Sequence, residues 1–219
     1  MVFDDLEVDS PVGRERFEER RVTIRAGEHV LICGAPGEGK TPLFRALSGL
    51  WPWGSGRIVR PRGESVMYVP RGTPYIPRGT LREVLAYPAL TDRFADAAYV
   101  QALEQTGLGR YARNLDAQRR WDHELREDEQ MALALARVLV HAPPWVVFDD
   151  TFSTMDDETL VRVIAMFTEH VTRTTIIHIG RSSQAQLPLF THVLHLKRVR
   201  SDATGTDEWV SERVLREAR

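Results

Sequence analysis

The chain has 219 residues, a hydrophobic share of 42% and a charged share of 27%, which suits one packed globular domain. Its net charge of −2 provides no basic field for nucleic acid, so we expect no nucleic-acid partner. The single cysteine, Cys33, excludes a disulfide framework, and no apolar stretch approaches the ~20 residues of a membrane span. The acidic start at residues 1–5 does not resemble a signal peptide, so we expect a cytosolic protein.

The first part of the chain alternates strand and helix patterns. Residues 2–25 predict two strands around a turn at 11–13, and the charged run 14–21 is expected to be a solvated hairpin face. The next predicted elements are a buried strand at 28–33, a helix at 42–50, and strands at 56–59 and 65–69. We expect Cys33 to be a core residue of the buried strand.

Helical periodicity dominates from residue 80 to about residue 137. We expect helices at 81–86, 95–105 and 127–141, followed by strands at 145–148, 174–179 and 192–196, a helix at 157–171 and a last strand at 208–214. This order predicts one α/β domain, residues 1–219, with a helical subdomain of about 80–137 inserted in its core.

A glycine-rich loop stands between the buried strand and the first helix. It reads Gly34-Ala-Pro-Gly-Glu-Gly-Lys-Thr41, a complete Gly-x-x-x-x-Gly-Lys-Thr phosphate-binding loop. Its glycines let backbone N–H groups surround a phosphate at the positive end of the following helix. Lys40 is expected to reach the β and γ phosphates, and Thr41 to ligate magnesium. The candidate nucleotide-binding residues are Gly34, Ala35, Pro36, Gly37, Glu38, Gly39, Lys40, Thr41 and Pro42.

The composition supports this interpretation over a glycine-rich turn without a ligand. Of 29 basic residues only Lys40 and Lys197 are lysine. Lysine and arginine are not interchangeable as compact phosphate ligands. A lysine retained at this position in an arginine-rich chain therefore favours phosphate binding.

Two carboxylates end the apolar strand at 145–148. In P-loop NTPases the first, here Asp149, orients magnesium, and the second, here Asp150, can polarise the attacking water as a general base. An acidic turn at a strand end is the alternative, and the phosphate loop upstream disfavours it.

The run Leu47-Ser-Gly-Leu-Trp-Pro-Trp-Gly-Ser-Gly-Arg-Ile58 resembles the segment after the phosphate loop in ABC transporter ATPase domains. It is similar in particular to domains fused to membrane halves of the peroxisomal fatty-acyl type and the bacterial SbmA/BacA-like type. Residues 74–83, 134–137 and 153–156 resemble further motifs of the same domains. The resemblance covers nearly the whole chain, in the correct order.

This resemblance implies a P-loop NTPase of the ABC type, with a mixed sheet core, an antiparallel β subdomain and an inserted helical subdomain. It implies ATP and Mg²⁺ as cofactors, Lys40 and Asp150 as catalytic residues, and Thr41 and Asp149 as metal ligands. The implied partners are a transmembrane permease half, fused or separate, and a second ABC ATPase domain in a head-to-tail dimer. The implied location is the cytoplasmic face of a membrane.

Four positions depart from the family pattern, and the first two concern contacts to the nucleotide. No glutamine stands near residues 70–73, where the family has one that senses magnesium. The family signature Leu-Ser-Gly-Gly-Gln aligns with Leu125-Arg-Glu-Asp-Glu129, whose carboxylates suit a helix N-terminus but would repel a polyphosphate.

The other two departures concern the catalytic groups. Asp150 replaces a glutamate, and the resulting displacement of about 1 Å can cost about 10²-fold in rate. Arg181 replaces the switch histidine; it can contact a phosphate but cannot shuttle a proton as imidazole does. The nearby His178 is expected to be an ordinary strand residue.

The resemblance also implies an aromatic residue that stacks on adenine, but residues 9–12, where it is expected, contain no aromatic residue. Phe3 and Phe17 are both candidates to replace it. We expect Trp51 and Trp53 to pack at the strand edge.

The sequence thus predicts an ATP-binding domain of an ABC transporter that hydrolyses ATP slowly. The alternative is a pseudo-ATPase, a nucleotide-binding subunit without productive turnover. A P-loop small-molecule kinase leaves the family motifs unexplained, and a DNA-repair ATPase would need a long heptad insertion that this chain lacks.

Overall fold

The computed structural model describes residues 1–11, 13–35 and 39–199. Its strands are β1 (Val2–Ser10), β2 (Gly13–Phe17), β3 (Arg21–Thr23), β4 (His29–Cys33), β5 (Gly54–Val59), β6 (Val66–Val69), β7 (Gly79–Thr80), β8 (Gln118–Arg119), β9 (Trp145–Asp149), β10 (Thr175–Gly180) and β11 (His192–Val199). Its α-helices are α1 (Lys40–Ser48), α2 (Leu81–Ala86), α3 (Asp96–Gln105), α4 (Trp121–Glu124), α5 (Glu127–His141) and α6 (Asp157–Glu169).

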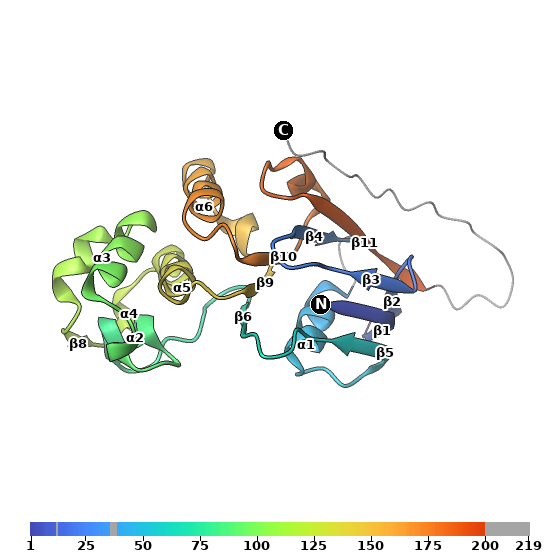
Figure 1. Ribbon diagram of the computed structural model, residues 1–219, viewed down its shortest axis with the longest axis horizontal. Helices are drawn as coiled ribbons and strands as arrows, with labels where there is room; N and C mark the ends of the chain where they lie inside the picture. Colours follow the sequence, from blue (N-terminus) through green and yellow to red (C-terminus); the bar gives the residue numbers. More distant parts are fainter. Residues whose placement is uncertain (12, 36–38, 200–219) are drawn as a thin grey trace, which may run out of the picture.

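One mixed sheet connects two groups of strands. β11, β4, β10, β9 and β6 lie side by side in that order, and each neighbouring pair is parallel. β11 runs on past β4 and pairs antiparallel with β2, which joins the antiparallel strands β1, β2, β3 and β5 to the parallel ones. The expected mixed sheet with an antiparallel part is therefore confirmed (Figure 1).

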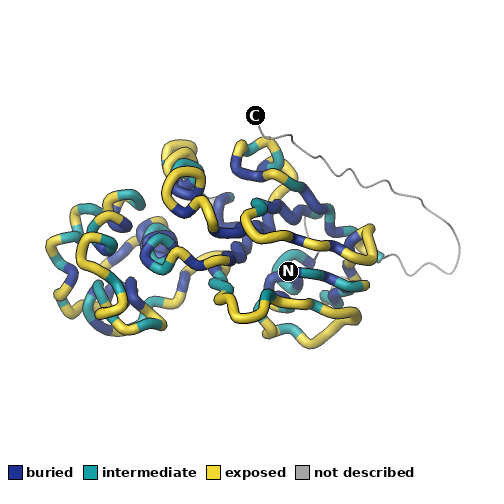
Figure 2. The backbone as a smooth tube through the Cα atoms, viewed as in Figure 1, coloured by how far each residue is buried: buried dark blue, intermediate teal, exposed yellow. Residues whose placement is uncertain are grey.

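Alternation along β4 explains the two core layers of the sheet. Val30 and Ile32 point to one face, where they pack with α1 and with β1 and β2. Leu31 and Cys33 point to the other face, where α5 and α6 cover the sheet. Because successive side chains of a strand point to opposite faces, a strand that is apolar throughout must be covered on both sides. Figure 2 shows this strand region as buried.

Helices α2 to α5 pack around an apolar cluster of their own, at the end of the molecule farthest from β1 and β5 (Figure 1). Tyr99 and Trp121 are its largest fully buried side chains. α5 contributes both to this cluster and to one core layer of the sheet, because Leu135 and Val138 face the sheet while Leu133 and Ala136 face α2 and α3. Among the described residues, no helix has the length and apolar character needed to cross a bilayer.

Arg137 of α5 links these helices to the connection after β6. Its guanidinium donates to the carbonyl oxygens of Val84 (3.0 Å) and Tyr75 (3.1 Å), and burial lowers its pKa. The arginine that ends the family-like run 134–137 thus has a structural role.

The expected elements are present with three differences. Residues 1–25 form three strands rather than two, since β3 pairs with β1 beyond the charged turn. The small elements β7, β8 and α4 were not expected. The run 14–21 is not simply a solvated face, because Glu15 and Phe17 of β2 point inward and are buried. The strand expected at 208–214 lies outside the described residues, and the division into one domain with an insert at 80–137 remains a prediction.

Candidate nucleotide-binding site

The phosphate loop, residues 34–41, joins the buried strand β4 to α1. Gly39 is the N-cap of α1 and has no side chain, so no side chain of the cap residue covers the first N–H groups of the helix. Those N–H groups and the helix dipole favour an anion at this end. Pro42 lies in the first turn of α1, where a missing N–H costs nothing. Pro36, Gly37 and Glu38 lie outside the described residues.

Lys40 is held against the start of the loop. Its ammonium group donates to the carbonyl oxygens of Gly34 and Ala35, both at 2.9 Å. The structure therefore places the expected phosphate ligand at the loop itself.

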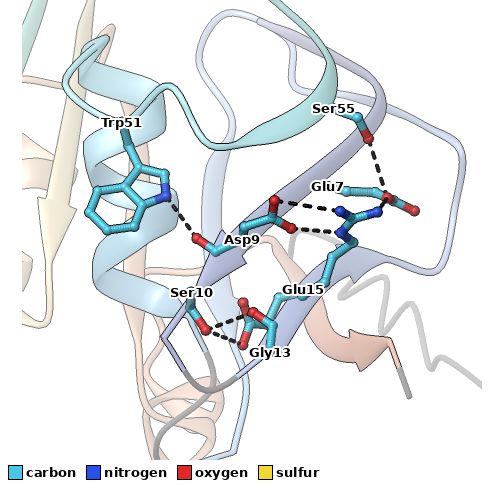
Figure 3. A network of polar contacts seen from close by, with 8 residues as sticks. Glu7, Asp9, Ser10, Gly13, Glu15, Trp51 and Ser55 are labelled. Atoms are coloured by element: carbon cyan, nitrogen blue, oxygen red, sulfur yellow. Dashed lines mark hydrogen bonds and ion pairs between the residues drawn. The ribbon is translucent and has the colours of Figure 1, made fainter. Parts of the chain in front are cut away.

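A buried carboxylate lies directly against this loop. Glu15 is fully buried, and a Cβ atom at Gly39 would stand 2.4 Å from its Oε2. Ser10 donates to its Oε1 at 2.9 Å, and the guanidinium Nε of Arg198 lies 3.9 Å from the same oxygen. Oε2 has no hydrogen-bond partner in the described part of the chain. Figure 3 shows Ser10 and Glu15 together on the β1–β2 hairpin.

Sequence reasoning missed Glu15 because it assigned the charged run to solvent. The signal that could have found it is strand alternation, since Glu15 shares a face with the aromatic Phe17.

Thr41, Asp149 and Arg71 form a chain of hydrogen bonds. The hydroxyl of Thr41 donates to Oδ2 of Asp149 at 3.3 Å and accepts from Nη2 of Arg71 at 3.2 Å. Asp149 ends β9, and Arg71 follows β6, the next parallel strand. The two expected metal ligands, Thr41 and Asp149, are therefore in direct contact. Arg71, which stands where a glutamine was expected, is hydrogen bonded to Thr41.

Asp149 is buried, and burial raises the pKa of its carboxyl. The positive charge of Arg71 and the hydrogen bond from Thr41 lower that pKa, while the charge of Asp150 raises it. A hydroxyl and a carboxylate are hard oxygen donors of the kind that Mg²⁺ takes, so this pair fits the metal chemically.

Asp150 is paired with a cation. Its backbone is in the left-handed region (φ 48°), and its N–H donates to the carbonyl of Ile179 at 2.7 Å. Oδ2 lies 3.7 Å from Nε of Arg181, whereas the buried Oδ1 has no hydrogen-bond partner in the described ranges. The expected general base and the residue in place of the switch histidine therefore form an ion pair.

His178 lies on strand β10, as expected, and its side chain belongs to the core. It is fully buried, its ring stacks on Phe152 with a centroid distance of 4.2 Å, and its Nε2 is 3.2 Å from Oε1 of Gln184. Burial lowers its pKa to about 3, so the imidazole is neutral at neutral pH.

Of the residues aligned with the family signature, Arg126 is the N-cap of α5 and residues 127–129 begin its first turn. Arg126 donates twice to Asp128, at 3.1 and 2.9 Å, and this pairing lowers the pKa of that carboxyl. The buried Glu129 accepts from Arg110 and from the backbone N–H of Arg126. Two of the three carboxylates expected to repel a polyphosphate are thus paired within the chain.

Neither candidate for adenine stacking is available. Phe3 and Phe17 are buried and stack on each other with ring centroids 5.5 Å apart, so both belong to the core. Trp51 packs as expected, with its indole N–H donating to the carbonyl of Asp9 at 2.8 Å (Figure 3). Trp53 is 59% exposed, and its ring packs edge-on against the ring of Trp51, with centroids 4.7 Å apart.

The phosphate loop follows one parallel strand, and its threonine is hydrogen bonded to a carboxylate at the end of a second parallel strand. This arrangement defines the class of P-loop NTPases. The ABC transporter family model matches residues 17–153. The chain belongs to this family, as an ATP-binding domain.

Its relatives are longer proteins. An uncharacterized ABC transporter ATP-binding protein of Haemophilus influenzae is 31% identical over 183 residues, covering 84% of this chain and 31% of the relative. ABC transporter D family member 1 of Arabidopsis thaliana is 32% identical over 190 residues, covering 78% of this chain and 14% of the relative. This chain therefore spans less than a third of either protein.

The fold has a solved counterpart in a bacterial Atm1-family ABC exporter with ATP bound. The two structures superpose with a TM-score of 0.71 at 20% sequence identity, over 90% of this chain and 36% of the exporter chain. This confirms the expected ABC-type fold.

Proposed function

We propose that this domain binds ATP with Mg²⁺ through residues 34–42 and Asp149, and that it hydrolyses the nucleotide slowly to drive transport. The observation that supports the proposal is the hydrogen bond from Thr41 to Asp149, which joins, at the phosphate loop, the two oxygens that we propose as metal ligands. Lys40 contributes a compact positive charge beside the same loop.

When bound, Mg²⁺ supplies charge neutralisation for the β and γ phosphates. The chain's own contributions are separate from the metal. The N–H groups at the start of α1 bind phosphate oxygens, and Lys40 adds its charge. Asp150 orients a water molecule and accepts its proton. Its short side chain and its pairing with Arg181 make that step slow.

The proposed partner is a transmembrane half, fused or separate, of the D-family or the SbmA/BacA-like type. Two features support it: the family membership and the small share of its relatives that the chain spans. The domain is proposed to act at the cytoplasmic face of a membrane, in a head-to-tail dimer with a second ABC ATPase domain.

A second candidate is a pseudo-ATPase that holds ATP without turnover. The ion pair between Arg181 and Asp150 favours it, because the guanidinium lies beside the carboxylate oxygen that would otherwise orient the attacking water.

The deciding experiment measures ATP binding and phosphate release for the wild type, Lys40→Ala, Asp150→Asn and Asp150→Glu. We expect Lys40→Ala to abolish binding. The ATPase is supported if the wild type releases phosphate slowly, if Asp150→Asn removes this release and if Asp150→Glu increases it. Binding without release, even in Asp150→Glu, supports the pseudo-ATPase. A wild type that does not bind ATP refutes both.

A further inference from the structure

Arg71 places a cation at the site proposed for magnesium. It follows the parallel strand β6 by two residues and is exposed, yet its Nη2 reaches the hydroxyl oxygen of Thr41. This oxygen is one of the two protein ligands that the metal needs.

The hydrogen bonds of Thr41 limit the lone pairs that its hydroxyl oxygen can offer to a metal. A hydroxyl has one hydrogen and two lone pairs. Here the hydrogen points to Asp149 and one lone pair accepts from Arg71, at 3.3 and 3.2 Å. A divalent cation on the same oxygen would share it with a guanidinium a few ångströms away, and the two positive charges would repel each other.

Arg71 also brings positive charge close to Asp149, because its guanidinium is hydrogen bonded to the hydroxyl that donates to this carboxylate. The guanidinium presents several N–H donors in a planar fork, which suits phosphate oxygens as well as a carboxylate.

We propose that Arg71 competes with Mg²⁺ at the Thr41–Asp149 pair and itself supplies positive charge to the bound triphosphate, so that this domain binds ATP with little dependence on magnesium. This inference rests on the proposed function, because it presupposes that ATP binds at the loop. The metal still fits the two oxygens, but it must displace the arginine to reach both.

The test is equilibrium titration of ATP, in excess Mg²⁺ and in EDTA, for the wild type and for Arg71→Gln. The matched control is Arg78→Gln: Arg78 is an exposed arginine of the same β6–β7 connection that makes no hydrogen bond or ion pair with the described residues. A second readout is Mn²⁺ bound in the nucleotide complex, measured by electron paramagnetic resonance.

For the wild type and for Arg78→Gln we expect the affinities in the two buffers to agree within about threefold. For Arg71→Gln we expect the affinity in EDTA to fall about tenfold and to be restored by Mg²⁺, because a hydrogen-bonded charge is lost. Mn²⁺ should bind more tightly to the Arg71→Gln complex than to the wild-type complex.

The inference is overturned if the ATP affinity of the wild type is tenfold or more lower in EDTA than in Mg²⁺, and if Arg71→Gln shows the same ratio of affinities. The proposed function would then still stand. Absence of ATP binding in both buffers overturns the proposed function, and the inference falls with it.

Discussion

Nε of Arg181 lies 3.7 Å from Oδ2 of Asp150, so residues at the ends of the adjacent parallel strands β10 and β9 form an ion pair. The side chain of Asp150 is 11% exposed, whereas that of Arg181 is 64% exposed. The resemblance noted in the sequence predicts that these residues stand where the family has a glutamate and a histidine. The guanidinium therefore lies beside the carboxylate that is expected to act as general base.

Replacement of Arg181 by Gln should raise the rate of ATP turnover. Without the guanidinium, Asp150 is free to accept a hydrogen bond from water. Since ion pairs with one exposed partner are worth little, we expect an increase of at most about fivefold. Phosphate release under saturating ATP measures it. The control is the double variant Asp150→Asn/Arg181→Gln, which should show no release. A lower rate in Arg181→Gln would mean that Arg181 itself stabilises the transition state.

Local patterns in the sequence were enough to predict the framework of the site. The apolar run of β4, the glycine loop and the spacing of α1 are contiguous, so the position of Lys40 follows from them. Asp149 follows from the apolar run of β9. The contact of Thr41 with Asp149 was expected only through the family motif, since 108 positions separate them.

The contacts that modify the site were not predictable in the same way. Arg71 reaches Thr41, and Glu15 reaches Gly39, through the register of strands far apart in the chain. Sequence periodicity does not encode such pairings. Glu15 was misplaced for a second reason: a charged residue in a charged run is normally exposed, and here the alternation of β2 buries it.

Restoring small residues in the signature should promote ATP-dependent dimerisation. The triple variant Arg126→Ser, Glu127→Gly and Asp128→Gly removes the two adjacent carboxylates and provides a hydroxyl and N–H groups for a partner's phosphate. We expect a larger dimer fraction with ATP than in the wild type, measured by sedimentation velocity. Glu104→Gln, at an exposed position on α3, matches the change in net charge and should have no effect. Equal dimer fractions in all three proteins would count against the proposed head-to-tail contact.

Gly39→Ala should destabilise the domain even without nucleotide. The added Cβ would meet the buried carboxylate of Glu15 at 2.4 Å, and overpacking of this kind costs about 1–3 kcal/mol. Urea unfolding measures the loss. Glu15→Ala in the same chain should recover most of it, because the clash is with that side chain. Gly109→Ala is the matched control, since the nearest atom to its Cβ would be a side-chain carbon of Glu104 at 3.3 Å. Additive effects of Gly39→Ala and Glu15→Ala would refute the proposed clash.

The buried His178 should make the domain less stable in mild acid. Its pKa is lowered by burial from 6.5 to about 3, so between these values the unfolded chain binds a proton that the folded chain does not. The contribution to stability is therefore complete above pH 6.5 and is lost as the pH falls toward 3. The loss is about 1.4 kcal/mol for each pH unit. His29 and His141, whose pKa values burial also lowers, act in the same direction.

His178→Phe removes this proton while keeping a planar ring against Phe152. The free energy of unfolding at about pH 7 minus that at about pH 5 should be smaller in the variant by about 2 kcal/mol. Urea unfolding at the two pH values measures the difference, and the contributions of His29 and His141 are common to both proteins. His170→Phe, at an exposed position after α6, is the control and should leave the difference unchanged. If His178→Phe and the wild type lose the same stability in acid, the imidazole is not the group that titrates.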